Sequence, residues 1–235
     1  KTLSVTMYES FSVQAFVGML SDAVHAALPR AKVTWHTTPL AYAETLLRIS
    51  DEDHATVIDV GGEVTDVMVL SHQSIAYVGS IPVGARTIQR ALITGKDGSL
   101  ADSASRLSMF ARGELAQKDM ESLAAALTKA AEPWRVGFLD ILAEAGNTVP
   151  VSHRVFVVGE RDELPWFSRV VSLVETRGQR PQSTIVTADF LGSALTYGEN
   201  GIFDASLALD ALFFHMRGMK HTHTTGTDPV LYSVQ

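Results

Sequence analysis

The segment 59–66, DVGGEVTD, carries the residue types in this chain that are best suited to chemistry. The adjacent Gly61 and Gly62 allow backbone N–H groups to approach an anion, and Asp59 at a strand end can hold a hydrated Mg²⁺. This combination suits a nucleotide triphosphate. A plain β-hairpin accounts for the same residues, with the glycines supplying positive φ and Asp59 solvated at the rim.

The elements around this segment place it at the end of a buried strand. Apolar runs predict strands at 55–60, 64–70 and 74–81, joined by two short connections as a β-meander. A further buried strand is predicted at Arg154–Val158, followed directly by Gly159. Ligands in open α/β sheets collect at the carboxyl ends of strands, so we expect Gly61 and Gly159 at neighbouring strand ends of one sheet.

The spacing of apolar residues at three- and four-residue steps predicts helices over most of the remaining chain. Pro133 lies inside the long helical region 118–145, where it either kinks one helix or opens a second. Trp35, Trp134 and Trp166 are expected to be buried. The predicted helices are 13–28, 39–49, 85–93, 100–112, 118–145, 165–174, 191–197 and 205–216, and further strands are predicted at 1–8, 32–37 and near Ile185.

Composition limits the classes of partner and compartment. The 235 residues carry 19 Lys and Arg against 26 Asp and Glu, a net charge of −7 that opposes binding to nucleic acid. The absence of cysteine excludes disulfides and thiol chemistry. Without an apolar run of roughly 20 residues or a charged-then-apolar leader, the chain is expected to be cytoplasmic.

The C-terminal region has two features with alternative interpretations. The helix at 205–216 is expected to pack on the sheet, and an interfacial membrane helix is the alternative. His221 and His223 stand two apart in a Thr-rich tail that is expected to be disordered, and we predict no metal site there.

The order of these motifs resembles one known superfamily. Val57–Leu70 is followed by the sequence SIPVGA at 80–85, is preceded by TPLA at 38–41, and precedes VFVVG at 155–159 with Leu164-Pro165 downstream. This series is similar to the second phosphate loop, the following helix start and the adenosine loop of actin-like ATPases, in particular the bacterial FtsA and PilM group. The resemblance implies an α/β, actin-like (ribonuclease H-like) ATPase half with a small β-α-β element at its N-terminus.

The resemblance also implies a domain division and a ligand. Residues 1–50 would be the remnant of a small β-α-β subdomain with the entry helix, 51–216 the second actin-like domain, and 217–235 the tail. ATP with Mg²⁺ is the implied cofactor, with Asp59 contacting the metal through water. The implied cofactor-binding residues are Asp59, Gly61, Gly62, Thr65 and Gly159, and no catalytic residue is assigned.

Several positions depart from the superfamily pattern. Glu63 replaces the third loop glycine and puts a carboxylate beside the phosphates. Ala104, Ser105 and Ser108 align with an Ala-Glu-x-x-Lys group whose charged side chains reach the nucleoside. Glu160 and Arg161 replace adenosine-loop glycines. ATP binding is therefore expected to be weak or lost.

Three functions remain open from the sequence. The first is an ATP-binding scaffold at the cytoplasmic membrane for type IV pilus or cell-division machinery, and the second is a degenerate scaffold that keeps only the protein contacts. The third is a sugar kinase or chaperone-type ATPase whose first phosphate loop lies upstream. We expect pilus or division proteins as partners and only indirect membrane contact. The edge strand of Leu3, Val5 and Met7 is expected to pair with a second copy of the chain, as a homo-oligomer, or with a partner peptide.

Overall fold

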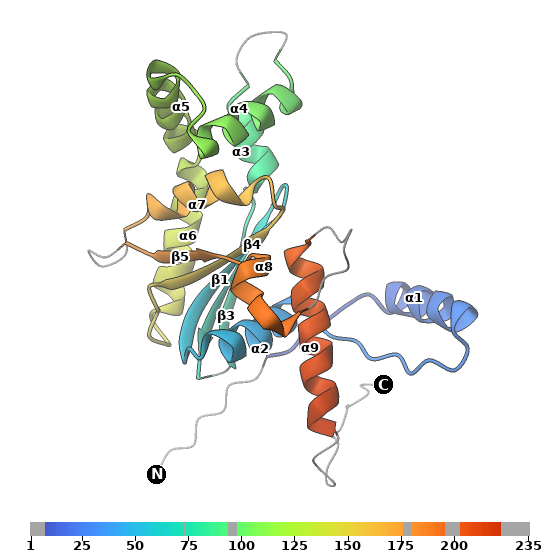
Figure 1. The fold of residues 1–235 in the computed structure, drawn as a ribbon. Helices are drawn as coiled ribbons and strands as arrows, with labels where there is room; N and C mark the ends of the chain where they lie inside the picture. Colours follow the sequence, from blue (N-terminus) through green and yellow to red (C-terminus); the bar gives the residue numbers. More distant parts are fainter. Residues whose placement is uncertain (1–7, 73, 94–97, 176–179, 196–202, 222–235) are drawn as a thin grey trace, which may run out of the picture.

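A five-stranded mixed sheet forms the centre of the molecule (Figure 1). The structure is a computed structural model and describes residues 8–72, 74–93, 98–175, 180–195 and 203–221. The strand order is β3-β2-β1-β4-β5, in which β2 is antiparallel to both neighbours while β4 runs parallel to β1 and β5. The strands are β1 (His54–Val60), β2 (Thr65–Ser71), β3 (Ser74–Ile81), β4 (Arg154–Gly159) and β5 (Gln182–Ile185).

The central strands are apolar on both faces because helices cover both sides of the sheet. Along β1, Val57 enters the core on one face and Ile58 the core on the other. In β4, Phe156 and Val157 divide in the same way. Side chains in a strand alternate between faces, so continuous apolar runs are the pattern expected of strands buried on two sides. The predicted meander and the α/β class are confirmed.

Of the helices between β3 and β5, α6 and α7 cover one face of the sheet, while α3, α4 and α5 pack against other helices beyond the strand ends (Figure 1). Trp134 and Phe138 stack at the centre of this face, and Phe167 packs edge-on against Trp134. Glu132 and Pro133 open a new helix, so the proline begins α6 instead of kinking one long helix. These helices are α3 (Ala85–Ala91), α4 (Leu100–Arg112), α5 (Gln117–Ala130), α6 (Glu132–Ala145) and α7 (Leu164–Ser172).

The other face is covered by α2 (Thr38–Ser50) and α9 (Ala205–His221), with the short α8 (Ala188–Leu191) beside them. Arg217 of α9 pairs with Glu44 of α2 at 2.7 Å. Leu209 and Phe213 are buried, which agrees with packing of this helix on the sheet. Within the described residues, no helix is both long and apolar enough to cross a membrane.

The helix α9 continues as far as His221, into the 217–235 segment expected to form a tail. His223 lies outside the described residues. The helix predicted at 191–197 is displaced, since α8 ends at Leu191 and a 3₁₀ turn follows at Gly192–Ala194. Thr187 explains the earlier start because its hydroxyl accepts from the Phe190 N–H as an N-cap.

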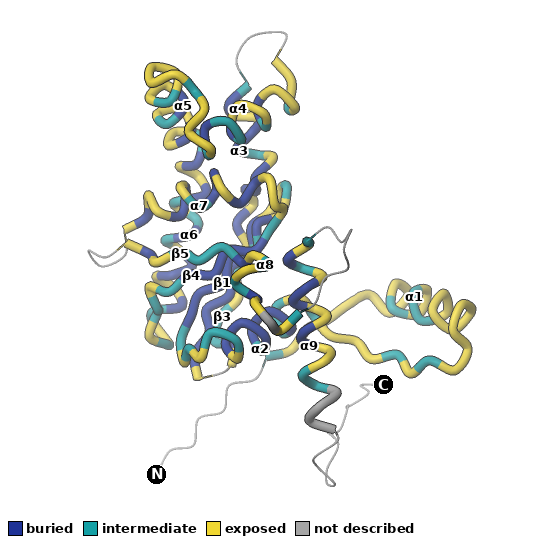
Figure 2. Tube along the Cα trace, viewed as in Figure 1, coloured by how far each residue is buried: buried dark blue, intermediate teal, exposed yellow. Residues whose placement is uncertain are grey.

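The N-terminal region differs most from expectation. Residues 1–7, with the predicted edge strand, lie outside the described residues. The strand predicted at 32–37 is wrong: residues 31–37 are irregular and pair with no described strand. Trp35 is 49% exposed instead of buried. The helix α1 (Gln14–Ala27) stands away from the sheet with no buried residue, as its exposed colouring in Figure 2 shows.

The buried and exposed faces of α9 should respond differently to the same leucine-to-alanine substitution. Leu209→Ala removes a side chain that is fully buried and should lower the free energy of unfolding by about 2–5 kcal/mol. Leu207→Ala, at a site 69% exposed, should change it by less than about 0.5 kcal/mol. Urea denaturation of both variants measures the difference, and equal losses would contradict docking of α9 through this face.

Candidate functional site

Two loops meet at the carboxyl ends of β1 and β4. The strands are parallel, and Val60 lies opposite Gly159 in their register. Gly61 therefore follows β1 beside the end of β4, as predicted. A Cβ atom on Gly159 would lie 2.9 Å from the Val60 carbonyl oxygen, which is closer than real Cβ contacts. Glycine is needed here because the two backbones approach so closely.

The loop after β1 packs backbone against backbone on the start of α3. The Gly61 carbonyl accepts from the Ala85 N–H at 3.0 Å, and the Gly62 carbonyl accepts from the Arg86 N–H at 2.9 Å. A Cβ on Gly84 would lie 2.3 Å from the Gly61 oxygen. Neither Gly61 nor Gly62 has positive φ, so a hairpin that needs glycine for that reason is wrong.

Thr65 is completely buried at the start of β2. Its hydroxyl donates to the Val83 carbonyl at 2.8 Å, which ties the strand to the segment leading into α3. The Gly61 N–H donates to the Val64 carbonyl at 2.9 Å. Two groups that the sequence assigns to a ligand therefore already have partners inside the protein.

Glu63 is held by α3. The Arg90 guanidinium donates to both of its carboxylate oxygens, and the Thr87 hydroxyl donates to one of them at 3.1 Å. The hydrogen bonds from Arg90 hold the pKa of Glu63 at about 2, well below its usual range. The carboxylate that replaces the third loop glycine therefore stays ionised.

Arg86 connects the two loops. Its Cδ lies 3.1 Å from the position that a Cβ on Gly62 would take, so the side chain lies over that glycine. Its guanidinium reaches Glu160 in the loop after β4, at 3.5 Å. The pair is more than half exposed, so it adds little to stability. It does place a cation and a carboxylate across the space between the loops.

A buried pair lies behind this surface. Gln89 of α3 donates to Glu163 at 3.3 Å, and both side chains are buried. Burial raises the pKa of Glu163, and the nearby Glu160 raises it further. The polar face of α3 thus contacts the loop after β1 and the loop after β4.

Asp59 lies near the carboxyl end of β1 with little access to solvent. Its pKa is raised to about 6, first by burial and then by the charges of Asp66 and Asp210. The pKa of the buried Tyr42 is also raised, first by burial and then by the charge of Asp59. The Ser80 hydroxyl donates to Asp66, which fixes the second carboxylate. Repulsion among these carboxylates is a cost that a bound cation would relieve.

These residues test whether ATP and Mg²⁺ fit. No three His, Asp or Glu residues in the described ranges are close enough together to hold a metal ion. Contact of Asp59 with a cation through water stays a prediction. The loop fits a triphosphate poorly for two reasons. The Arg86 side chain covers Gly62, and the two nearby arginines are already paired with carboxylates, Arg90 with Glu63 and Arg86 with Glu160.

Sequence reasoning missed four residues that shape this site. Asp210 comes from α9 and Tyr42 from α2, and no local pattern links these distant helices to Asp59. Arg86 and Arg90 could have been found, because they stand four residues apart on the helix that follows the glycine loop. That spacing places both cations on the same side of a helix.

Comparison with known proteins gives a limited result. No family model matches the sequence, and no curated protein matches it either. The ethanolamine utilization protein EutJ from Carboxydothermus hydrogenoformans is 18% identical, covering 63% of this chain and 49% of that one, with a TM-score of 0.44. A PilM–PilN type IV pilus biogenesis complex is 17% identical, covering 68% and 44%, with a TM-score of 0.47.

A third solved structure, MreB5 of Spiroplasma citri bound to ADP, is 13% identical, covering 92% of this chain and 69% of that one, with a TM-score of 0.49. The chain spans about half the length of the first two structures. Likeness at this level carries no argument by itself, and the strand order is the stronger observation. A β3-β2-β1-β4-β5 sheet with only β2 antiparallel is the ribonuclease H-like order. The protein therefore has a ribonuclease H-like α/β fold.

The contact between Gly84 and the glycine loop can be tested by mutation. Gly84→Ala should lower the free energy of unfolding by about 1–3 kcal/mol, because the new methyl group meets backbone that must move. Gly18→Ala is the matched control, since nothing lies within 4 Å of a Cβ there. Thermal and urea denaturation compare the two variants. Equal stability of Gly84→Ala and the parent chain would show that the loop does not pack as described.

The raised pKa of Asp59 predicts a dependence of stability on pH. The folded chain holds this proton up to a pH of about 6 and the unfolded chain only to 3.8, so stability falls as the pH rises through this window. Asp59→Asn should therefore stabilise the protein at pH 7 by about 2–3 kcal/mol and much less at pH 4. Urea denaturation at both pH values measures it, with the exposed Asp189→Asn as control. A gain that does not vary with pH would contradict the burial of this carboxyl.

Proposed function

We propose that this chain is the second half of an actin-like scaffold protein of the FtsA and PilM type. It would organise an assembly at the inner face of the cytoplasmic membrane, in a type IV pilus or in cell division, through protein contacts. ATP binding is weak or absent. The ordered motif series and the strand order support the superfamily, and the pairing of the loop residues supports the loss of nucleotide.

The observation that carries this proposal is the self-pairing of the two loops. Arg90 is bound to Glu63, and Arg86 is paired with Glu160. A phosphate would have to displace carboxylates that already neutralise these cations. Two like charges about 4 Å apart repel by roughly 1–4 kcal/mol between bulk water and a protein surface. An incoming polyphosphate meets that penalty at both loops.

The nucleoside side of the site is equally poor in suitable groups. Ser105 is exposed on α4, and the Ser108 hydroxyl accepts a hydrogen bond from Arg112 at 2.6 Å. Arg112 in turn pairs with Glu114. No Glu and Lys stand at the positions that the superfamily uses for the nucleoside, so adenosine would gain little there.

Protein contacts have a visible candidate in the exposed helix α1. Phe16 and Met19 of this helix are 52% and 60% exposed, and Phe11, which precedes the helix, is 90% exposed. An isolated helix of 14 residues is marginal in water, so a helix of this kind gains stability when another surface covers its apolar side. This feature supports a role in assembly, including a homo-oligomer or a pilus or division partner.

An active ATPase or sugar-kinase-like enzyme is the second candidate. The partly buried Asp59, with its raised pKa, favours it, because a carboxyl with a perturbed pKa at a strand end is typical of ligand sites. Its first phosphate loop would then lie upstream of Lys1. In that case Glu63 and Glu160 would have to leave their arginine partners when nucleotide binds.

Calorimetry with Mg-ATP separates these candidates. The chain should give no binding heat up to about 1 mM ATP. A Kd above this concentration corresponds to a binding free energy weaker than about 4 kcal/mol. Glu63→Gly with Glu160→Gly should free both arginines and raise the affinity by at least about tenfold. Glu175→Gly is the matched control, since Glu175 also pairs with an arginine but lies outside the site. Micromolar binding by the unmodified chain, about 8 kcal/mol, would overturn the degenerate scaffold.

A further inference from the structure

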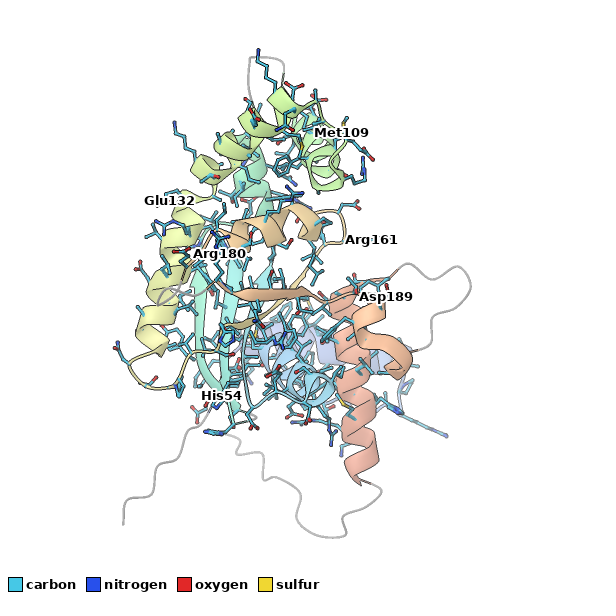
Figure 3. All side chains as sticks on the ribbon, turned by 60° about the vertical axis from the view of Figure 1, so that its left-hand side comes forward. His54, Met109, Glu132, Arg161, Arg180 and Asp189 are labelled. Atoms are coloured by element: carbon cyan, nitrogen blue, oxygen red, sulfur yellow. The ribbon has the colours of Figure 1, made fainter. Side chains whose placement is uncertain are left out.

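A groove lies beside the glycine loop, at the carboxyl ends of β4 and β5. It is bounded by the loop after β4, by α8 and by the start of α9, and its volume is about 780 Å³. This size falls within the range of ligand-binding clefts. Arg161 and Asp189, labelled in Figure 3, come from the loop before α7 and from α8, both of which border the groove.

The floor of the groove is apolar. Leu164, Pro165, Ile185, Val186 and Phe203 line it, and they come from three separate segments of the chain. A ligand that fills this floor gains by removing apolar surface from water, at about 25 cal/mol per Å². The occupant therefore needs an apolar part.

The rim of the groove is acidic. Glu160, Asp162, Asp189 and Asp204 stand around it, and Arg161 is the cation among the lining residues. Two of the carboxylates have internal partners: Glu160 pairs with Arg86, and Asp204 accepts from the Leu207 N–H at 2.9 Å. Asp162 and Asp189 are exposed. Together with the net charge of −7, this rim attracts a cationic ligand and repels a polyphosphate.

The groove adjoins β5, which is an edge strand among the residues that the structure describes. The strand order ends at β5, which pairs with β4 on one side. The N–H groups of Gln182 and Val186 donate to the carbonyls of His153 and Val157. Alternate residues of a strand face opposite neighbours, so Ser183 and Ile185 turn their backbone groups to the open edge. Such an edge is a template for an added strand of polypeptide.

We propose that the groove and the β5 edge bind an extended peptide segment of a partner protein, in which Lys or Arg residues stand next to apolar ones. The peptide adds a strand to β5, places its apolar side chains on the floor and directs its basic side chains to Asp162 and Asp189. This inference rests on the proposed scaffold function, since it names the kind of partner that replaces nucleotide at this end of the sheet.

Fluorescence anisotropy with a synthetic peptide tests the proposal. The probe is a labelled decapeptide of alternating Lys and Val, with alternating Glu and Val as its matched control. The Lys peptide should bind the whole chain with a Kd of roughly 10–100 μM and weaken as salt increases. The Glu peptide should bind at least about tenfold more weakly. Equal binding of the two peptides overturns the proposal.

Two changes test the two contacts separately. Asp162→Lys with Asp189→Lys should weaken the Lys peptide at least about tenfold, whereas Asp119→Lys, on the exposed surface of α5, should weaken it only slightly. N-methylation of alternate peptide bonds removes donors from the peptide and leaves the protein unchanged, so binding should be lost if the peptide adds a strand. Unchanged binding in either experiment overturns the proposal.

Competition with Mg-ATP distinguishes the failure of this inference from the failure of the scaffold function. If ATP binds and displaces the Lys peptide, the groove is a nucleotide site and both proposals fail. If neither ATP nor the Lys peptide binds, the peptide site fails while the scaffold function stands.

Discussion

The parallel pairing of β1 with β4 is the constraint on which the rest of this structure depends. It places Val60 beside Gly159, and therefore brings together two loops that are almost one hundred residues apart in the sequence. Both strands are buried on two faces, so a shift of one residue in their register would move apolar side chains from one core to the other. The geometry of the loops is thus fixed by the packing of the sheet.

The side chains of helix α3 contact both of these loops. Its residues Arg86 and Arg90 contact carboxylates of the two loops, and Gln89 contacts the buried Glu163. The individual surface pairs are weak in water. Their effect is electrostatic: the cations that could receive an anion are neutralised by the chain itself, while the carboxylates of Asp59, Asp66 and Asp210 leave the nearby strand ends negative.

Much of the fold could be predicted from the sequence because its signals are local. The double-sided runs of β1 and β4 and the meander follow from short patterns of apolar residues, whereas the pattern around Pro133 left a kink and a new helix both open. The strand at 32–37 failed because alternation cannot supply a neighbouring strand, and Trp35 is exposed for the same reason. At the site, the segment 59–66 and Gly159 were found by their pattern. Asp210 and Tyr42 were not, since only tertiary packing of α2 and α9 brings them to Asp59.

The backbone contact between Gly84 and Gly61 has a consequence for how glycine-rich loops are interpreted. Glycine is needed at Gly84 because a side chain there would prevent one peptide segment from lying directly on another. This requirement is independent of any ligand. A chain that ceased to bind nucleotide would still lose stability if these glycines were replaced. Backbone packing can therefore require these glycines whether or not the loop binds nucleotide. The charged residues around the loop are better indicators of its ligand than the glycines.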